Sequence, residues 1–265
     1  MSRKGMSAKN PVVSVIMNCF NSDRFLKEAI DSIYAQTFQD WEIIFWDNAS
    51  TDSSAEIARS YDERVKYYLA PETTPLGDAR KLALNNVTGK YIAFLDCDDR
   101  YLPDKLEKQV ALMEVEGCQL SYGSVVVINE HGEKMRKCTM KNTSGDLFGL
   151  LLKKYEINMQ TVMMKSSLFE EDWCDFNANL HYSPDYNLFM HIASRYPVGV
   201  VSDVLAHYRV YPGSLSRKML GVVSKEMKYT LDSIFSVNPD LKSRVLDAAS
   251  FAYAKLNYYD AVYLV

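Results

Sequence analysis

Short apolar runs, each followed by a helical pattern, constrain the fold of this chain more than any other feature. The runs at 12–17, 41–46, 65–69 and 91–95 are rich in β-branched and aromatic residues, as buried strands are. The helical patterns that follow them cover 24–36, a segment that starts near residue 53, 77–87 and 104–116. This alternation predicts an α/β fold with a mostly parallel central sheet and flanking helices.

The alternation weakens near Cys118, which divides the chain. We expect a disordered N-terminal tail at 1–10, a first half at 11–117, a second half of the same domain at 118–220, and C-terminal helices at 221–265. The second half opens with a β-rich stretch and a hairpin turn at 129–132. In the C-terminal segment, the apolar positions with approximate helical spacing are Leu241, Val245, Ala248, Phe251 and Leu256. The chain stops inside such a pattern, which indicates a piece of a longer protein.

Charge and cysteine content exclude several classes of protein. The formal net charge is −4 and there is no basic block, so nucleic acid is not an expected partner. The five cysteines are widely spread and form no Cys-x-x-Cys pair, which argues against a disulfide framework and a thiolate zinc site. No secretory signal or membrane-spanning run is present, so we expect a cytoplasmic protein. Peripheral membrane association through the C-terminal helices and the oligomeric state stay open.

Acidic side chains follow two of the expected strands. Asp47 closes the second strand, and Asp96, Asp98 and Asp99 follow the fourth. The carboxyl ends of parallel strands meet at one edge of a sheet, which is where ligands bind in such folds. Carboxylates crowded together raise one another's pKa unless a cation compensates them. The pattern therefore predicts a divalent metal, Mn²⁺ or Mg²⁺, held together with substrate phosphates.

Five segments, in order along the chain, resemble glycosyltransferase family 2, which has the A-type glycosyltransferase fold. They are VSVIMNCFN at 13–21, AQTF at 35–38, WDNASTD at 46–52, GDAR at 77–80 and GKYIAFLDCDD at 89–99. The resemblance extends over roughly 11–216. It implies a Rossmann-like nucleotide-diphospho-sugar transferase, with the donor bound by residues 11–117 and the acceptor by residues 118–220.

The resemblance also implies roles for individual residues. Those expected around the nucleotide are Asn18, Phe20, Asn21, Asp47, Asn48, Arg80 and Asp96. Asp98 would be the main metal ligand, with Asp96 beside it. Candidate diphosphate contacts are Arg209, Arg217 and Lys218, in a loop that would close over the leaving group. The competing interpretations are strand-end packing for Asn18 and Phe20, and solvated surface for the basic residues.

The segment at 181–190 resembles the acidic motif of the family at the start of a helix, which makes Asp185 the expected general base. Its carboxylate would take the proton of an acceptor hydroxyl, on a saccharide or a glycolipid, while that oxygen attacks the anomeric carbon. Such a direct displacement inverts the configuration of the sugar. The alternative is that Asp185 only caps its helix.

The chain departs from the family pattern at three positions. Asn48 replaces a frequent second aspartate, Ala49 a frequent glycine, and Tyr211 an expected histidine ligand, while His207 stays unassigned. An Asn amide still pairs with uracil, so a UDP-sugar remains the favoured donor. Two alternatives stay open: a nucleotidyltransferase of similar fold, although the first strand is not followed by a glycine-rich loop, and an inactive nucleotide-sugar-binding paralogue.

Overall fold

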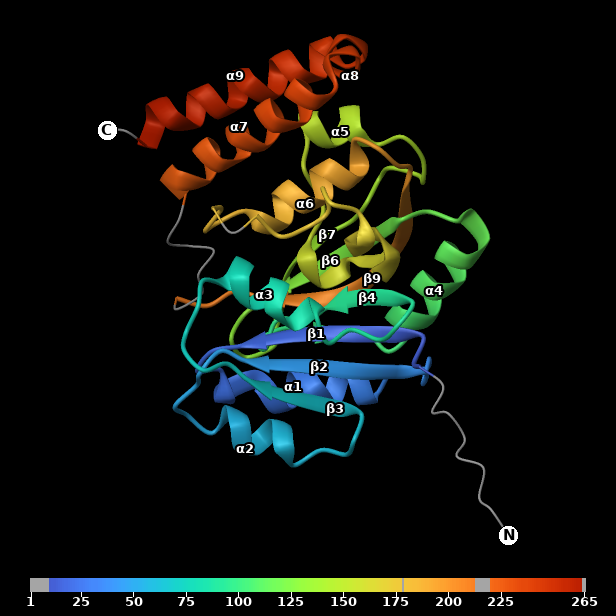
Figure 1. Ribbon diagram of the computed structural model, residues 1–265, viewed down its shortest axis with the longest axis vertical. Coiled ribbons are helices and arrows are strands. Elements are labelled where there is room, and N and C mark those ends of the chain that lie inside the picture. Colours follow the sequence, from blue (N-terminus) through green and yellow to red (C-terminus); the bar gives the residue numbers. More distant parts are fainter. Residues whose placement is uncertain (1–9, 178, 213–219, 264–265) are drawn as a thin grey trace.

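The structure is a computed structural model that describes residues 10–177, 179–212 and 220–263 (Figure 1). The tail expected at residues 1–10 lies almost wholly outside the described residues. The boundaries at 117 and 220 stay predictions, because one continuous sheet runs through both halves of the chain.

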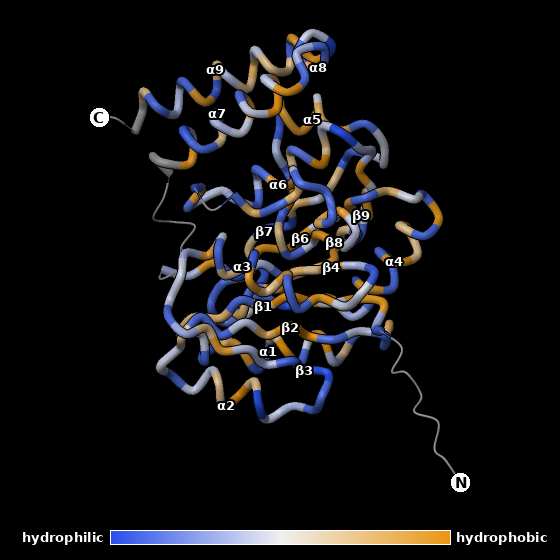
Figure 2. Tube along the Cα trace, in the orientation of Figure 1, coloured by the Kyte–Doolittle hydropathy of each residue, from blue (hydrophilic) through white to orange (hydrophobic). Residues whose placement is uncertain are grey.

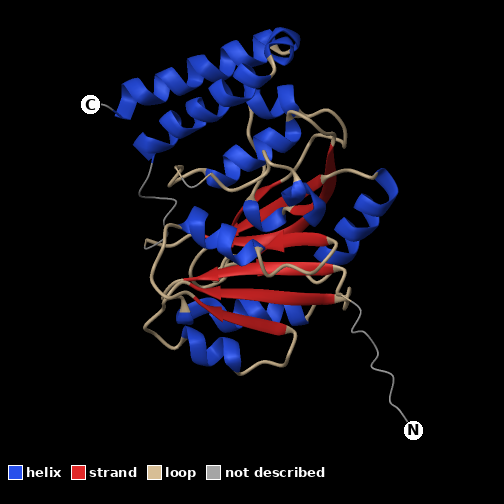
Figure 3. Cartoon of the chain, viewed as in Figure 1, coloured by secondary structure: helices blue, strands red, loops and turns tan. Residues whose placement is uncertain are grey.

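The first half alternates strands and helices as the sequence predicts. Its elements are β1 (Val13–Cys19), α1 (Asp23–Tyr34), β2 (Trp41–Asp47), α2 (Ser54–Arg59), β3 (Val65–Leu69), α3 (Leu76–Leu84) and β4 (Tyr91–Phe94). Every residue of β2 is buried, because helices cover both faces of the sheet (Figure 3). Apolar residues run almost without interruption along such strands, which is why the sequence marks them so clearly.

The second half is less regular. Its elements are β5 (Arg100–Tyr101), α4 (Lys105–Glu116), β6 (Leu120–Ile128), β7 (Lys134–Cys138), α5 (Phe148–Lys153), the 3₁₀ turns η1 (Met159–Thr161) and η2 (Ser166–Glu170), β8 (Met163–Lys165), α6 (Pro184–Ala193) and β9 (Val198–Arg209). Three helices follow: α7 (Leu220–Val237), α8 (Pro239–Arg244) and α9 (Leu246–Tyr263).

The sheet has the order β3-β2-β1-β4-β8-β6-β9-β5, with β7 paired to β6. The first four strands are parallel, as predicted. Beyond β4 the sheet is mixed, because β8 pairs antiparallel with both β4 and β6, while β6 and β9 are parallel. The hairpin predicted at 129–132 is confirmed and joins β6 to β7. Asn129 shapes it by accepting from the backbone N–H groups of His131 and Glu133, each at 3.0 Å.

Two apolar cores lie on opposite faces of the sheet. Alternate residues of β1 separate them: Val15 and Met17 face the core under α1, α2 and α4, whereas Ile16 faces the core under α3, α5 and α6. Figure 2 shows hydrophobic residues concentrated along the central strands of the sheet. The five cysteines are free thiols and four of them are buried, as expected.

The C-terminal helices belong to the second core. Leu241, Ala248 and Leu256 are buried in it, as their spacing predicts. Phe251, which belongs to the same apolar pattern, is 52% exposed, and Ala252 occupies the inward position of α9 instead. Within the described residues, we find no helix that is both long and apolar enough to span a bilayer.

Substitution of Gly89 tests how closely β1 packs against the turn before β4. In Gly89→Ala, the new Cβ would lie 2.6 Å from the backbone nitrogen of Ser14 and 2.9 Å from the carbonyl carbon of Val13. Because backbone atoms cannot yield, we expect the free energy of unfolding to fall by about 2 kcal/mol. Gly149→Ala in α5 is the matched control, since its Cβ would meet only Val245, at 3.5 Å, and should stabilise the helix by about 0.5 kcal/mol. Urea unfolding measures both. Equal stability of Gly89→Ala and the wild type would contradict the packing.

Candidate active site

The carboxyl ends of β1, β2 and β4 meet at one edge of the sheet (Figure 1). Cys19 at the end of β1 lies opposite Asp47 at the end of β2, and Ile16 lies opposite Phe94, the last residue of β4. The backbone N–H of Asn48 donates to the carbonyl of Cys19 at 2.8 Å, which ties the first two loops together. The predicted convergence of Asp47 and the acidic cluster at one edge is therefore confirmed as geometry.

The polar side chains at the end of β2 form hydrogen bonds within the protein. Asp47 is fully buried, and its carboxylate accepts from the backbone N–H of Ser50 at 2.8 Å and from the Tyr67 hydroxyl at 2.5 Å. The Asn48 amide is bound to Thr74: it donates to the Thr74 carbonyl at 2.7 Å and accepts from the Thr74 N–H and hydroxyl at 3.1 Å. These contacts give both residues a role in shaping the loop, and a direct nucleotide contact by either stays a prediction.

The end of β1 and the loop that follows it contain three of the residues predicted to contact the nucleotide. Phe20 is 51% exposed, and the Asn18 amide nitrogen is buried without a hydrogen-bond partner among the described residues. Asn21, at φ 48°, accepts from the Thr51 N–H at 2.8 Å. Ala49 has φ 64°, in the left-handed region where glycine is easiest, which explains the glycine frequent there in the family that this chain resembles.

Asp96 is held from two sides. Its Oδ1 lies 3.6 Å from a guanidinium nitrogen of Arg80, which is itself almost fully buried. Its Oδ2 accepts from the Gln160 side-chain amide at 2.5 Å, and its own N–H donates to the Gln160 side-chain oxygen at 2.9 Å. This role of Gln160 is not predicted from the sequence, because a single glutamine in the short turn η1 belongs to no motif. The two-point contact fixes the orientation of Asp96.

Asp98 and Asp99 experience the crowding that the sequence predicts. Burial, together with the charge of Asp96, raises the pKa of Asp98 to about 6, while a hydrogen bond from the Tyr211 hydroxyl opposes the rise. The pKa of Asp99 is raised well above its ordinary range, mainly by burial. Asp99 accepts from the Arg209 N–H at 2.6 Å, but its second oxygen has no partner among the described residues. Tyr211, where the family pattern has histidine, thus reaches the predicted metal ligand.

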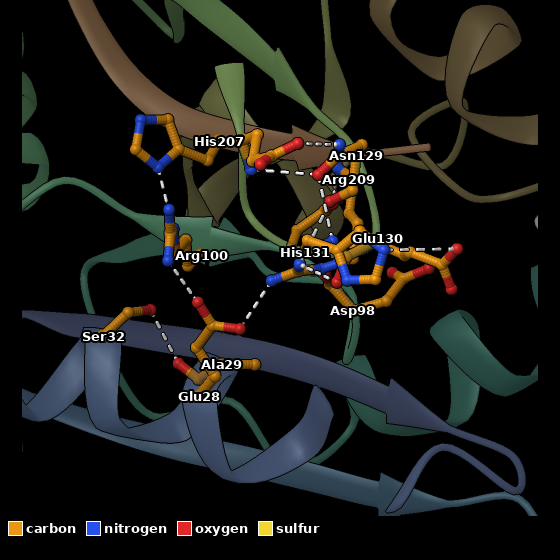
Figure 4. Close-up of polar contacts among 12 residues, drawn as sticks. Glu28, Ala29, Ser32, Asp98, Arg100, Asn129, Glu130, His131, His207 and Arg209 are labelled. Carbon is orange, nitrogen blue, oxygen red and sulfur yellow. Dashed lines mark hydrogen bonds and ion pairs between the residues drawn. The ribbon is translucent and has the colours of Figure 1, made fainter. Parts of the chain in front are cut away.

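Arg209 faces the protein interior. Its side chain is 2% exposed and donates to the carbonyls of Asp98 at 2.8 Å, Asn129 at 3.3 Å and Glu130 at 3.1 Å. It also pairs with the Glu28 carboxylate at 2.5 Å (Figure 4). The Arg209 donors are therefore used inside the protein, which does not favour the predicted diphosphate contact; that contact stays an untested prediction.

Of the remaining candidates, the structure describes His207 but not the two other basic residues. Arg217 and Lys218, the remaining candidate diphosphate contacts, lie outside the described residues. His207 accepts from the Arg100 Nε at 2.8 Å (Figure 4). Burial and the charge of Arg100 lower the pKa of His207 to about 4, so the ring is neutral near pH 7. His207 has a structural partner, in line with its having no assigned role.

Asp185 reaches the same edge from the other half of the chain. It lies in the first turn of α6, whose N-cap is Ser183, so Asp185 is not the N-cap residue. Desolvation raises the pKa of the Asp185 carboxyl, whereas the nearby Arg80 guanidinium lowers it and the Asp96 charge raises it. The start of α3, the helix of Arg80, packs against the start of α6, since a Cβ on Gly77 would lie 3.6 Å from the Pro184 Cβ. The predicted base therefore lies near Arg80, which belongs to the predicted nucleotide site.

The ligand atoms at this edge suit a hard divalent cation. Asp96 and Asp98 offer carboxylate oxygens, which are the atoms that Mg²⁺ and Mn²⁺ bind in proteins. No group of three or more His, Cys, Asp or Glu side chains in the described ranges is arranged to hold a metal. A divalent ion held by the carboxylates of Asp96 and Asp98 would take its other ligands from water and substrate phosphates.

Comparison with known proteins agrees with this geometry. Residues 14–174 match Glycosyl transferase family 2. Over 204 residues the chain is 34% identical to an uncharacterized glycosyltransferase of Rickettsia felis; the match covers 76% of this chain but only 33% of the relative, so the chain spans about a third of that protein. Over 233 residues it is 26% identical to the UDP-Glc:alpha-D-GlcNAc-diphosphoundecaprenol beta-1,3-glucosyltransferase WfgD of Escherichia coli, covering 86% of this chain and 88% of WfgD.

Solved structures share the fold. S. aureus TarS 1–349 in complex with UDP-GlcNAc superposes with a TM-score of 0.69 at 19% identity, covering 95% of this chain and 71% of TarS. The mannosyltransferase PcManGT from Pyrobaculum calidifontis, in complex with GDP-Man and Mn²⁺, gives a TM-score of 0.60 at 16% identity, covering 96% of this chain and 75% of PcManGT. The A-type fold is thereby confirmed, and since the family match spans more than half of the chain, the protein belongs to glycosyltransferase family 2.

Proposed function

We propose that the chain is an inverting, metal-dependent glycosyltransferase that moves a sugar from a UDP-sugar to a hydroxyl of a saccharide or glycolipid. The observation that carries this proposal is that Arg80 of α3 lies 3.6 Å from the Asp96 carboxylate, while the start of α3 packs against Pro184, the neighbour of Asp185: a Cβ on Gly77 would lie 3.6 Å from the Pro184 Cβ. A donor bound at the edge would present its anomeric carbon to an acceptor beside Asp185. The names of WfgD and of the TarS complex, which include UDP-Glc and UDP-GlcNAc, favour uridine nucleotides.

Each residue has a distinct task in this mechanism. Phe20 and the unpaired amide of Asn18 lie against the nucleotide, while Arg80 and Gln160 hold Asp96 in place. Asp98, with Asp96, would hold a divalent ion, which when bound supplies positive charge to the departing diphosphate. The Mn²⁺ in the PcManGT complex favours this assignment.

Bond making at the anomeric carbon then depends on Asp185. The acceptor oxygen bonds to the anomeric carbon as the bond from that carbon to the diphosphate breaks, and the hydroxyl proton moves to a carboxylate oxygen of Asp185. The raised pKa of Asp185 favours this step, since a carboxylate with a higher proton affinity is a better base. Attack from the face opposite the leaving group inverts the sugar.

Nucleotide binding tests the site directly. In calorimetric titrations with UDP, GDP and dTDP, each with Mn²⁺ and again with EDTA, we expect UDP to bind only with Mn²⁺. Asp98→Ala should abolish this binding, because it removes the main metal ligand. Asp203→Ala is the control, since Asp203 is exposed and pairs with Lys108 away from the edge. Absence of binding by all three nucleotides would rule out the assigned site.

Because the acidic turn is crowded, Asp98 should lower the stability of the folded protein in the absence of metal. Because the folded protein raises the pKa of Asp98 from 3.8 to about 6, ionisation of Asp98 opposes folding. This loss of stability is absent below about pH 4 and grows as the pH rises through about 6. We therefore expect Asp98→Asn, in EDTA, to melt above the wild type at pH 7.5, and the gap to shrink towards pH 4. Calorimetric melting curves measure this, and a lower melting temperature for the variant at pH 7.5 would contradict it.

The variant Asp185→Asn tests whether Asp185 is the general base. Turnover of UDP-glucose or UDP-GlcNAc with Mn²⁺, followed as UDP release, should fall by about 10² or more, because the amide cannot take the proton. UDP affinity should stay unchanged. Asp146→Asn, which alters an exposed carboxylate paired with Arg244, is the control. Full turnover by Asp185→Asn would refute the assignment, and UDP binding without any wild-type turnover would favour the inactive paralogue.

A further inference from the structure

Glu226 on α7 binds the chain segment that leads into α6. Its carboxylate accepts from the backbone N–H groups of three successive residues: His181 at 2.8 Å, Tyr182 at 3.0 Å and Ser183 at 2.8 Å. It also accepts from the Ser183 hydroxyl at 2.9 Å. Consecutive N–H groups that converge on one carboxylate form an anion nest, so this is a specific contact and not a chance approach.

The contact lies at the N-cap of α6 and on the two residues before it. Ser183 is the N-cap of α6, yet its side chain makes no capping hydrogen bond to its own helix and donates to Glu226 instead. The first N–H groups of a helix need partners, and a negative charge near them is favourable. A side chain of α7 therefore fixes the start of α6, two residues before Asp185.

Two more polar contacts continue along the same interface. The Asn187 amide donates to the Thr230 hydroxyl at 3.1 Å, and His191 Nε2 lies 2.9 Å from the Ser233 hydroxyl. Residues 226, 230 and 233 share one face of α7, because their spacing is that of a helix. Figure 1 shows α6 and α7 packed side by side. The contacts set the position of α6 along its axis, and the Glu226 contact is the one nearest the base.

We propose that Glu226 is a positioning residue for the glycosyl transfer: by holding the backbone of 181–183, it sets the orientation of Asp185 towards the acceptor hydroxyl. This inference rests on the proposed function of Asp185. It makes α7 part of the catalytic apparatus, although α7 contributes no group to the reacting atoms. A shift of about 1 Å in a catalytic group is enough to reduce turnover severely.

Glu226→Ala and Glu226→Gln test the proposal, the second variant keeping the bulk of the side chain. With UDP-glucose and Mn²⁺, we expect kcat to fall about tenfold or more, because Asp185 loses its orientation. KM for UDP-glucose and the affinity for UDP should stay within about threefold, because the nucleotide edge is untouched. Hydrogen exchange at the amides of 181–183 should accelerate. Unchanged kcat in both variants would overturn the proposal.

Tyr253→Phe is the matched control. It removes a 2.6 Å hydrogen bond from the Tyr253 hydroxyl to Asp232 on α7, at the interface with α9, and neither partner of this bond lies on α6. We expect it to alter the melting temperature while leaving kcat and the exchange of 181–183 at wild-type values. A fall in kcat equal to that of Glu226→Ala would mean that any loosening of α7 reduces turnover, and would refute a specific role of Glu226.

A double variant separates this proposal from the one on which it rests. If Glu226 acts through Asp185, then Glu226→Ala should reduce kcat little further in the Asp185→Asn background, whereas independent effects would multiply. Multiplied effects would overturn the proposal. If Asp185→Asn alone turns over like the wild type, the base assignment falls and this inference falls with it. If Asp185→Asn is impaired but Glu226→Ala is not, only the role of Glu226 is refuted.

Discussion

The crowding of three carboxylates in the turn after β4 is the constraint on which the rest of the site depends. Asp98 and Asp99 have raised pKa values, and the compensating cation on the protein side is Arg209, which reaches the turn from the end of β9. Burying a guanidinium is favourable only when its donors are used, and Glu28 of α1 together with the turn carbonyls use them. The acidic turn in the first half of the chain is therefore incomplete without β9, the last strand of the second half.

The sequence predicts what local patterns control. Uninterrupted apolar runs identify β1 to β4, and because parallel strands end at one edge, the positions of Asp47 and Asp98 follow from chain order alone. The same reasoning fails where a residue's role depends on a distant partner. Nothing local distinguishes Arg209, which is buried against Glu28, from a basic residue of a surface loop. Gln160 and Glu226 likewise carry no local sequence signal of their roles, because their partners are backbone and side-chain groups that only folding brings near them.

The departures from the family pattern have different physical consequences. Ala49 adopts φ 64°, so the turn keeps the conformation that glycine would give it, at some expense in backbone strain. Tyr211 replaces an imidazole by a phenol, which donates to Asp98 and so withdraws electron density from the predicted ligand. A neutral phenol is a weaker metal ligand than imidazole. In the proposed site, the affinity for a divalent ion would then depend more heavily on the carboxylates and on the phosphates of the donor.

Unsatisfied polar groups indicate where folding and function compete. Two of the buried atoms that lack a partner within the described residues, the Asn18 amide nitrogen and an oxygen of Asp99, flank the edge at which β1 and β4 end. Leaving such a group unpaired costs about 1–3 kcal/mol, and a chain selected only for stability would remove it. Local violations of this kind are expected at functional sites. The unpaired groups lie beside Asp96 and Asp98. The ligand proposed for this site, a nucleotide with its cation, would therefore relieve both the unpaired polar groups and the repulsion among the carboxylates.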